Sequence, residues 1–341
     1  MADWLGGYSA GWDVYSVDQD TWAESEPIDG IMSVSIAKDG TDDTPLLETG
    51  TMQADAGSPF EWSWCRIFMV ATQDASERIP MATMLFERGN VRTSHRSSTC
   101  ELRGKSVLQP AADRKLARGR FAKSGIDGAA FAASLLRECT PAPVVVEGSF
   151  TLVDDLVFDL GASYLQAAWQ LVKAADWCIQ IDGYGTIYIR EKPTEPAFEL
   201  DKVNEGLLIP GVDMTLDISE VPNRYIAVDN GVTETAENDD PNLLASYTRR
   251  GRWVDFVDSS PVRIDGETLH GYAVRKLAEM GTVTREFSYT REWQPDAVPF
   301  SLVRATLPEH GLEGDLRILR QTLNCAKGVT VSETAGEEVR V

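Results

Sequence analysis

The clearest pattern of apolar and polar positions lies in residues 158–192. Apolar side chains recur there at the i, i+3, i+4 and i+7 spacing of one helical face, at Leu165, Ala168, Trp169 and Val172. Two runs of period two follow, around Ile179 and Ile187, and Asp182-Gly183-Tyr184-Gly185 separates them. A glycine-containing turn between two alternating runs is typical of a β-hairpin. This stretch therefore predicts one amphipathic helix followed by one tight hairpin.

Short strands are predicted from the start of the chain to about Arg103. Met32, Val34 and Ile36 alternate with small polar residues, and Lys38-Asp39-Gly40 then supplies a turn. Further strands are expected at residues 61–70, 80–87 and 97–104. On one face of the first of these, Arg66 stands among Trp62, Trp64, Phe68 and Val70. Five or six strands at this spacing predict a barrel or a sandwich.

The middle of the chain combines a helix pattern with two linkers. Residues 108–125 are rich in Arg and Lys with few large apolar side chains, so we place a domain junction there. Asp127 is a plausible cap for a helix with Phe131, Leu135 and Leu136 on one face, and Pro141 ends it. Residues 195–212 are interpreted as a second linker.

The last third returns to strands around one helix. Strands are expected at residues 214–218, 224–228, 286–293, 300–307, 316–322 and 329–331. A helix is expected after Asp265, with Leu269, Ala273, Leu277 and Met280 on one stripe and Gly281 as its end. The fold class expected is mainly β, with two β-barrel domains flanking a small α/β domain and a small helix-containing insertion.

Composition supports a folded protein of two to four domains. The chain has 341 residues, of which 43% are hydrophobic and 9% aromatic, which excludes wholesale disorder. No stretch approaches the roughly 20 apolar residues needed to span a bilayer, and we expect no membrane span. The first seven residues lack the basic and apolar regions of a secretory signal. Five cysteines without metal-type spacing are interpreted as reduced thiols: Cys65, Cys100, Cys139, Cys178 and Cys325.

Charge is high and unevenly distributed. The formal net charge is −21, which disfavours general nucleic-acid binding because an acidic field repels phosphate. Residues 88–123 are nevertheless basic and nearly free of acids. They are interpreted either as a solvated face and linker or as a contact surface for an acidic neighbouring subunit. The candidate subunit-contact residues are Arg114, Lys115, Arg118 and Arg120.

Reactive side chains form no recognisable constellation. The three histidines, His95, His270 and His310, are far apart and have no partner at a metal-ligand spacing. Acidic clusters such as Asp154, Asp155 and Asp159, or Glu286 and Glu292, are expected by chance in so acidic a chain. A pair of carboxylates that catalyses glycoside hydrolysis is the alternative interpretation. Gly183-Tyr184-Gly185 is interpreted as a turn and not a phosphate loop, because no helix begins after it. We therefore expect no catalytic residue, no cofactor and no metal.

Tryptophan leaves a third interpretation open. Most of the nine tryptophans fall at inward-facing positions and are interpreted as core. Trp4 and Trp22 lie near turns and are the better candidates for an exposed contact, as in a carbohydrate-binding adhesin.

The order of these patterns resembles the bacteriophage tail hub family, the baseplate-hub and tail-tip hub proteins. Four segments carry the resemblance: residues 12–22, which begin Trp12-Asp13-Val14-Tyr15-Ser16; Glu48-Thr49-Gly50-Thr51-Met52 with the strand at 61–70; the helix and hairpin ending at Ile189; and Val221-Pro222-Asn223-Arg224-Tyr225-Ile226-Ala227-Val228.

The resemblance implies a domain order and a function. The domains would be an N-terminal β-barrel at 1–107, an α/β middle domain at 108–205, a second β-barrel at 206–239 and 297–341, and a small helix-containing insertion at 240–296. The protein would be a non-enzymatic virion protein at the phage tail tip, made in the cytoplasm of a bacterial host. It would form a homotrimer whose pseudo-sixfold ring joins the tail tube to tip components and lets DNA pass during ejection. The partners implied are the tail tube, the distal tail protein, the tape measure protein, and tail-tip or fibre proteins. The alternatives are a tail-associated glycan hydrolase using Asp or Glu and the carbohydrate-binding adhesin.

Overall fold

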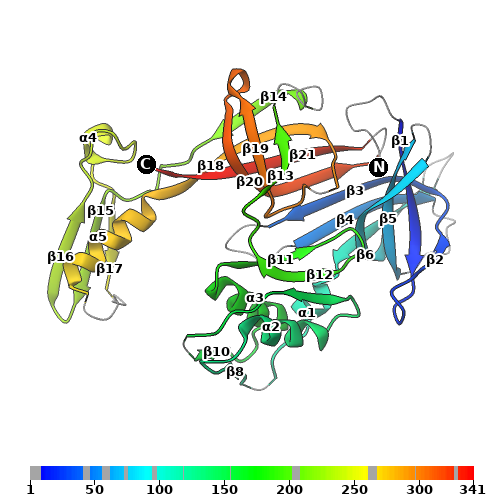
Figure 1. Cartoon of the computed structure of the whole chain (residues 1–341), viewed down its shortest axis with the longest axis horizontal. Coiled ribbons are helices and arrows are strands. Elements are labelled where there is room, and N and C mark those ends of the chain that lie inside the picture. The colour runs from blue at the N-terminus through cyan, green and yellow to red at the C-terminus, as the bar shows by residue number, and fades with distance from the viewer. Residues whose placement is uncertain are drawn as a thin grey trace. The chain divides into compact units, whose positions relative to one another are not determined.

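The protein folds into two compact units in a computed structural model (Figure 1). The residues that the structure describes are 9–40, 47–55, 62–72, 76–93, 98–117, 119–153, 155–201, 208–259, 267–295, 297–325 and 329–341. The first unit comprises residues 1–212 and 288–335, and the second comprises residues 213–287 and 336–341. The boundary falls within three strands, which are β14 (Leu208–Thr215), β18 (Thr282–Glu292) and β21 (Thr330–Arg340).

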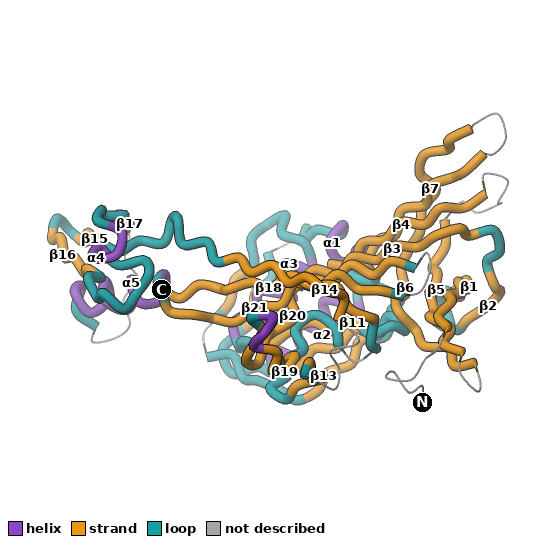
Figure 2. Tube along the Cα trace, turned by 90° about the horizontal axis from the view of Figure 1, so that it is seen from above, coloured by secondary structure: helices purple, strands orange, loops and turns teal. Residues whose placement is uncertain are grey.

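A sheet of seven neighbouring strands builds the N-terminal part of the first unit. Its order is β3 (Ile31–Asp39), β4 (Leu47–Asp55), β7 (Ser98–Ser106), β6 (Ser76–Thr93), β5 (Trp62–Thr72), β1 (Ser9–Val17) and β2 (Glu24–Pro27). Neighbours β3, β4 and β7 run side by side in Figure 2. Buried side chains from β1 and from β3, such as Val14 and Val34, belong to one apolar core. The predicted strands of this region are therefore present, and the sheet curls around its own interior.

C-terminal strands extend the same sheet. Strand β20 (Leu312–Asn324) pairs antiparallel with β3, so segments nearly 300 residues apart become neighbours. Strand β19 (Leu302–Leu307) pairs with β20, and a short 3₁₀ helix (Pro308–His310) connects them. Strand β13 (Pro196–Leu200) joins β19 in a parallel pair. Part of the predicted linker at 195–212 is thus a strand, because a non-local partner satisfies its backbone groups.

An α/β module fills residues 107–192 of the first unit. Helices α2 (Gly128–Arg137) and α3 (Tyr164–Ala174) pack together and cover a sheet of order β11 (Trp177–Ile181), β12 (Ile187–Glu191) and β9 (Val144–Glu147). Asp127 caps α2 as predicted, by accepting from the backbone N–H groups of Ala129 and Ala130. The module also contains α1 (Gln109–Asp113) and a ribbon of β8 (Phe121–Ala122) and β10 (Leu156–Val157).

The predicted junction at 108–125 differs from the structure. Leu108, Ala111 and Leu116 are buried in the core that the module shares with α2 and α3. The described Arg and Lys residues of this segment are exposed or half-buried, and small apolar residues supply its packing. Large apolar side chains were a poor guide here because alanine fills much of this core.

The second unit is a small three-stranded sheet covered by one helix. Its order is β16 (Val232–Glu237), β15 (Arg224–Asp229) and β17 (Asp255–Asp258), and α5 (Leu269–Met280) packs against β15 and β16. A short helix α4 (Tyr247–Arg250) precedes β17. The predicted helix is confirmed, with Thr268 as its N-cap and Gly281 after its last residue. Asp265, after which the helix was expected, lies outside the described residues.

The mainly-β fold class with an α/β module and a helix-containing unit is confirmed. One boundary differs, since residues 224–237 were predicted in the second barrel and instead pair with β17 beneath α5. Alternation of apolar residues identified these strands correctly but could not say which partners they would choose. In the part of the chain that the structure describes, the pairings form a path from β2 to β14. The division into four domains stays a prediction.

Candidate functional site

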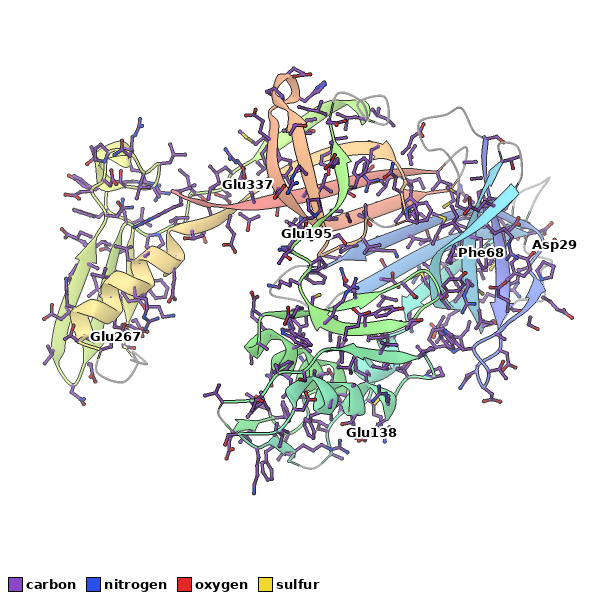
Figure 3. The ribbon with its side chains drawn as sticks, in the orientation of Figure 1. Asp29, Phe68, Glu138, Glu195, Glu267 and Glu337 are labelled. Carbon is purple, nitrogen blue, oxygen red and sulfur yellow. The ribbon has the colours of Figure 1, made fainter. Side chains whose placement is uncertain are left out.

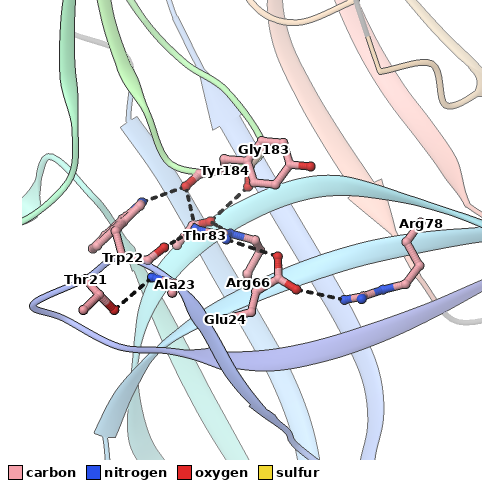
Figure 4. A network of polar contacts seen from close by, with 9 residues as sticks. All are labelled: Thr21, Trp22, Ala23, Glu24, Arg66, Arg78, Thr83, Gly183 and Tyr184. Atoms are coloured by element: carbon pink, nitrogen blue, oxygen red, sulfur yellow. Dashed lines mark hydrogen bonds and ion pairs between the residues drawn. The ribbon is translucent and has the colours of Figure 1, made fainter.

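The hairpin turn between β11 and β12 is the point at which the α/β module is bonded to the N-terminal sheet (Figure 4). The Thr83 hydroxyl donates to the Gly183 carbonyl at 3.0 Å. The Trp22 indole N–H donates to the Tyr184 carbonyl at 2.9 Å, and Arg66 donates to the same carbonyl at 3.0 Å. The turn predicted at Asp182–Gly185 is present and accepts three hydrogen bonds from residues more than 90 positions away in the sequence.

Arg66 is the centre of this network. Its residue exposure is 4%, and its Nε donates to the Thr83 hydroxyl at 3.0 Å. Its terminal nitrogens donate to the Trp22 carbonyl and to the Glu24 carboxylate, both at 3.3 Å. A guanidinium offers five N–H donors in a rigid planar fork, so one side chain can bridge several acceptors at fixed angles. Arg66 thereby ties three segments together.

Close packing at the turn requires glycine. A Cβ atom on Gly183 would lie 2.0 Å from the Pro80 carbonyl oxygen, which is backbone and cannot move aside. Gly185 has φ +78°, and a Cβ there would meet Thr83 at 2.9 Å. On the other side of the contact Trp22 adopts φ +57°, a conformation that bulky residues rarely adopt. The hydrogen bonds of the Trp22 indole and carbonyl hold it there.

These residues bind one another and therefore act structurally. The hydrogen bonds and ion pairs drawn in Figure 4 all join residues of this chain, and Trp22 packs on Trp64 with ring centroids 5.3 Å apart. Trp22 was a candidate for carbohydrate stacking, but its indole belongs to this junction. Trp4 lies outside the described residues. Sequence reasoning missed the junction, and the available signal was a lone arginine on an otherwise apolar strand face.

A second, fully buried ion pair joins β18 to β21. Arg291 and Glu333 have side chains with no exposed surface and lie 2.6 Å apart. The Tyr289 hydroxyl donates to Glu333, and Gln321 donates to the same carboxylate at 2.6 Å. Burial first, and then the Glu333 charge, raise the pKa of Tyr289 well above its usual value. The carboxylate is thus compensated by donors on every side, as a buried charge requires.

Two of the predicted subunit-contact residues, Arg114 and Arg120, meet around Tyr164. Their guanidinium carbons lie 5.0 and 5.1 Å from the Tyr164 ring centroid. Arg120 also makes two hydrogen bonds of 2.9 Å to Glu138, which is labelled in Figure 3, and Arg114 donates to the Glu138 carbonyl. The hydrogen bonds from Arg120 lower the pKa of Glu138 below its ordinary value.

The other two predicted contacts are placed differently. Lys115 is exposed, and its ammonium donates to the Ala112 carbonyl at 3.1 Å. Arg118 lies outside the described residues. The basic segment is therefore partly neutralised within its own chain, and its role in subunit contact stays a prediction.

The surroundings of the described cysteines and histidines give little support for a catalytic or metal-binding role. Burial raises the pKa of Cys178 and of Cys325 to about 12 and that of Cys65 further, so these thiols are protonated at neutral pH. His270 is exposed, with Nδ1 3.7 Å from Glu234, while His95 lies outside the described residues. Among the carboxylates, Asp155 accepts from the Ser124 N–H at 2.7 Å, and Asp154 is not described. Within the described ranges, no group of His, Cys, Asp or Glu is arranged to hold a metal ion.

Two cavities lie in different units. One, of about 290 Å³, is in the first unit beside the hairpin turn and is lined by Lys38, Asp182 and Arg190 among others. Lys38 is 3% exposed, pairs with the buried Glu48 at 3.0 Å and donates to the Met81 carbonyl at 3.0 Å. The other cavity, of about 250 Å³, is in the second unit between β16 and α5.

Solved structures share this fold over the whole chain. A tail protein from Neisseria meningitidis MC58 superimposes with a TM-score of 0.66 at 14% identity, covering 97% of both chains. The 43 kDa tail protein of prophage MuSo2 from Shewanella oneidensis gives 0.63 at 11% identity, over 97% of this chain and 98% of that one. The chain has the fold of phage tail proteins. The predicted resemblance is therefore confirmed at the level of the fold.

The comparisons extend to one further assembly. A chain of the Francisella PdpA–VgrG complex gives a TM-score of 0.56 at 6% identity, where 97% of this chain matches 58% of that one. No protein-family model matches the chain, and no curated protein matches it in sequence. None of the helices in the described part of the chain is both long and apolar enough to span a membrane.

Proposed function

We propose that this protein is a structural component of a phage tail, the hub at its distal end. The observation that carries the proposal is the full-length fold match to two tail proteins, each covered over at least 97%. The arrangement of the first unit fits such a role. Its ion pairs and its turn junction hold the N-terminal strands and the α/β module in fixed positions, which suits a rigid structural component.

The hub would work as a homotrimer. Three copies, each with two sheet-rich regions, would form a pseudo-sixfold ring between the sixfold tail tube and threefold tip components. Closed rings of this kind leave few strand edges without a partner. Neighbours in the virion would be the tail tube, the distal tail protein, the tape measure protein and tail-tip or fibre proteins.

The ring would also form the channel for DNA ejection. Three chains of charge −21 carry 3 × (−21) = −63 in total. An acidic wall lets DNA pass without adhering, since phosphate is repelled. The role is non-enzymatic, and burial supports this for Cys65, Cys178 and Cys325 because it raises the pKa of these thiols and disfavours the reactive thiolate.

Electron microscopy of phage particles from the producing strain tests the proposal. Gold-labelled antibody against the chain should mark the tail end remote from the capsid. Label on the capsid, or particles whose tails carry none, would refute the assignment. A reducing-sugar assay of the purified chain on host envelope material should show no release, and turnover there would favour the glycan hydrolase instead.

A further inference from the structure

The N-terminal sheet presents a basic edge on β6. This strand is 18 residues long, and its pairing with β5 runs from Thr72↔Ser76 to Trp62↔Glu87. Residues 88–93 continue past that point and pair with β7 as far as Thr93↔Ser98. In the part of the chain that the structure describes, no strand pairs with the other edge of this extension.

The extension is exposed and carries cations. Its sequence, Arg88-Gly89-Asn90-Val91-Arg92-Thr93, contains two arginines and no acid. Val91 is 50% exposed although it is a large apolar residue on a strand edge. The Arg92 guanidinium is exposed and forms no ion pair or hydrogen bond with any described residue. An accessible strand edge of this kind is a template for pairing with another chain.

The opposite end of the same sheet is acidic. Strand β2 (Glu24–Pro27) ends the sheet path and is exposed at all four residues. Residues 18–29 contain five acids and no base. Glu24 is engaged by Arg66 and Arg78, but the carboxylates of Glu26 and Asp29 bond to no described residue. Asp29 is labelled beside this strand in Figure 3.

Within one chain β2 pairs with β1 and not with β6, and Arg78, the β6 residue that contacts Glu24, lies outside the extension. We propose that the β6 extension of one copy docks on β2 of a second copy, with Arg92 facing Glu26 and Asp29. The contact is heterologous, since each copy uses a different edge, and it closes into a ring when the rotation between neighbouring copies is one third of a turn. The proposal rests on the homotrimeric hub proposed above and supplies its subunit interface.

Charge complementarity identifies the occupant. The chain as a whole carries −21, so the basic edge of one copy is attracted to the acidic surface of a second copy. Pairing would cover Val91 and satisfy the backbone groups of both edges that pair with no described strand. Exposed ion pairs are weak and are screened by salt, so the contact should loosen between about 50 and about 500 mM NaCl.

Sedimentation velocity on the full chain tests this with a charge swap. Arg92→Glu and Glu26→Lys should each weaken self-association about tenfold or more, and the double variant should recover to within about threefold of wild type. Arg252→Glu, an exposed arginine of the second unit, makes the same charge change and should have no effect. Circular dichroism should show all variants folded, because the substituted side chains are exposed.

The opposing outcomes are distinct. Single variants that associate like wild type would overturn this contact and leave the trimeric hub intact. Loss of duplex-DNA binding by Arg92→Glu, with unchanged self-association, would assign the arginines to nucleic acid and also overturn it. In assembled particles, the pair Val91→Cys and Ser25→Cys should form a disulfide between copies, seen as a trimer on a non-reducing gel. Failure to cross-link in tails that carry the chain at their tip would reject the contact and not the function.

Discussion

At the scale of single residues, Arg66 determines how the α/β module is held. Replacing it by methionine keeps much of the stem and removes every donor, so the Trp22 carbonyl loses its partner and the Tyr184 carbonyl keeps only the Trp22 indole N–H. We expect the free energy of unfolding to fall by about 2–4 kcal/mol. Urea denaturation measures this, with Arg252→Met as the matched exposed control, expected within about 0.5 kcal/mol of wild type. Equal stability of the Arg66 variant and wild type would show that the network contributes little.

Glu138 makes stability depend on pH. Arg120 lowers the pKa of this carboxyl in the folded state below the ordinary value of 4.5, so the unfolded chain binds the proton more tightly. The stabilisation is complete above about pH 4.5 and disappears as pH falls through the lower, folded pKa. The pair is exposed by more than a third, which limits its contribution to about 0.5–1 kcal/mol.

The Glu138→Gln variant reveals that contribution. At pH 7 it should unfold at a lower urea concentration than wild type, and the difference should shrink as the pH is lowered below 4.5. A gap that stays constant, or grows in acid, would contradict the assignment.

At the scale of elements, the hairpin turn at residues 182–186 depends on glycine. Gly183→Ala places a Cβ 2.0 Å from the Pro80 carbonyl oxygen, so backbone must shift on one side of the junction. We expect a loss of about 1–3 kcal/mol, read as a lower thermal midpoint. Gly11→Ala in β1 is the control, because a Cβ there meets nothing within 4 Å. An unchanged midpoint for Gly183→Ala would show that the turn is not tightly seated.

The elements also show what the sequence could and could not reveal. The helix and hairpin of residues 164–191 follow from local periodicity, because each buries a face whose spacing is fixed by backbone geometry. The pairing of β13 with β19 involves residues more than 100 positions apart, and no local pattern reports it. For the same reason, residues 224–237 were predicted in the second barrel, whereas in the structure they form a sheet with β17. The local sequence determines whether a segment forms a strand, whereas the strand with which it pairs depends on residues far away in the sequence.

The candidate site was harder to predict than the fold for a related reason. Arg66 is unusual on its apolar strand face, but nothing in its segment identifies its partners. Gly183 is ordinary in its turn, and the two form a junction only once β5 meets that turn. The predicted contacts Arg114 and Arg120 were chosen for charge alone. In the structure much of that charge is directed to Glu138 and Tyr164 within the module. A run of like charges in sequence therefore overstated the charge available to a partner.

At the scale of the whole molecule, the proposed hub role depends on the fold shared with tail proteins and on strand edges that a second copy would cover. An acidic chain with a basic strand edge should repel its copies in most orientations and attract them in one. Salt should therefore loosen the assembly at the proposed contact, even though it screens the overall repulsion.

The mass of the purified chain in solution distinguishes a threefold hub from a protein that acts as a single chain. Light scattering coupled to gel filtration should give three times the 37.5 kDa of one chain at low salt. A mass of one chain that persists to high protein concentration, or an even-numbered assembly, would contradict a threefold hub.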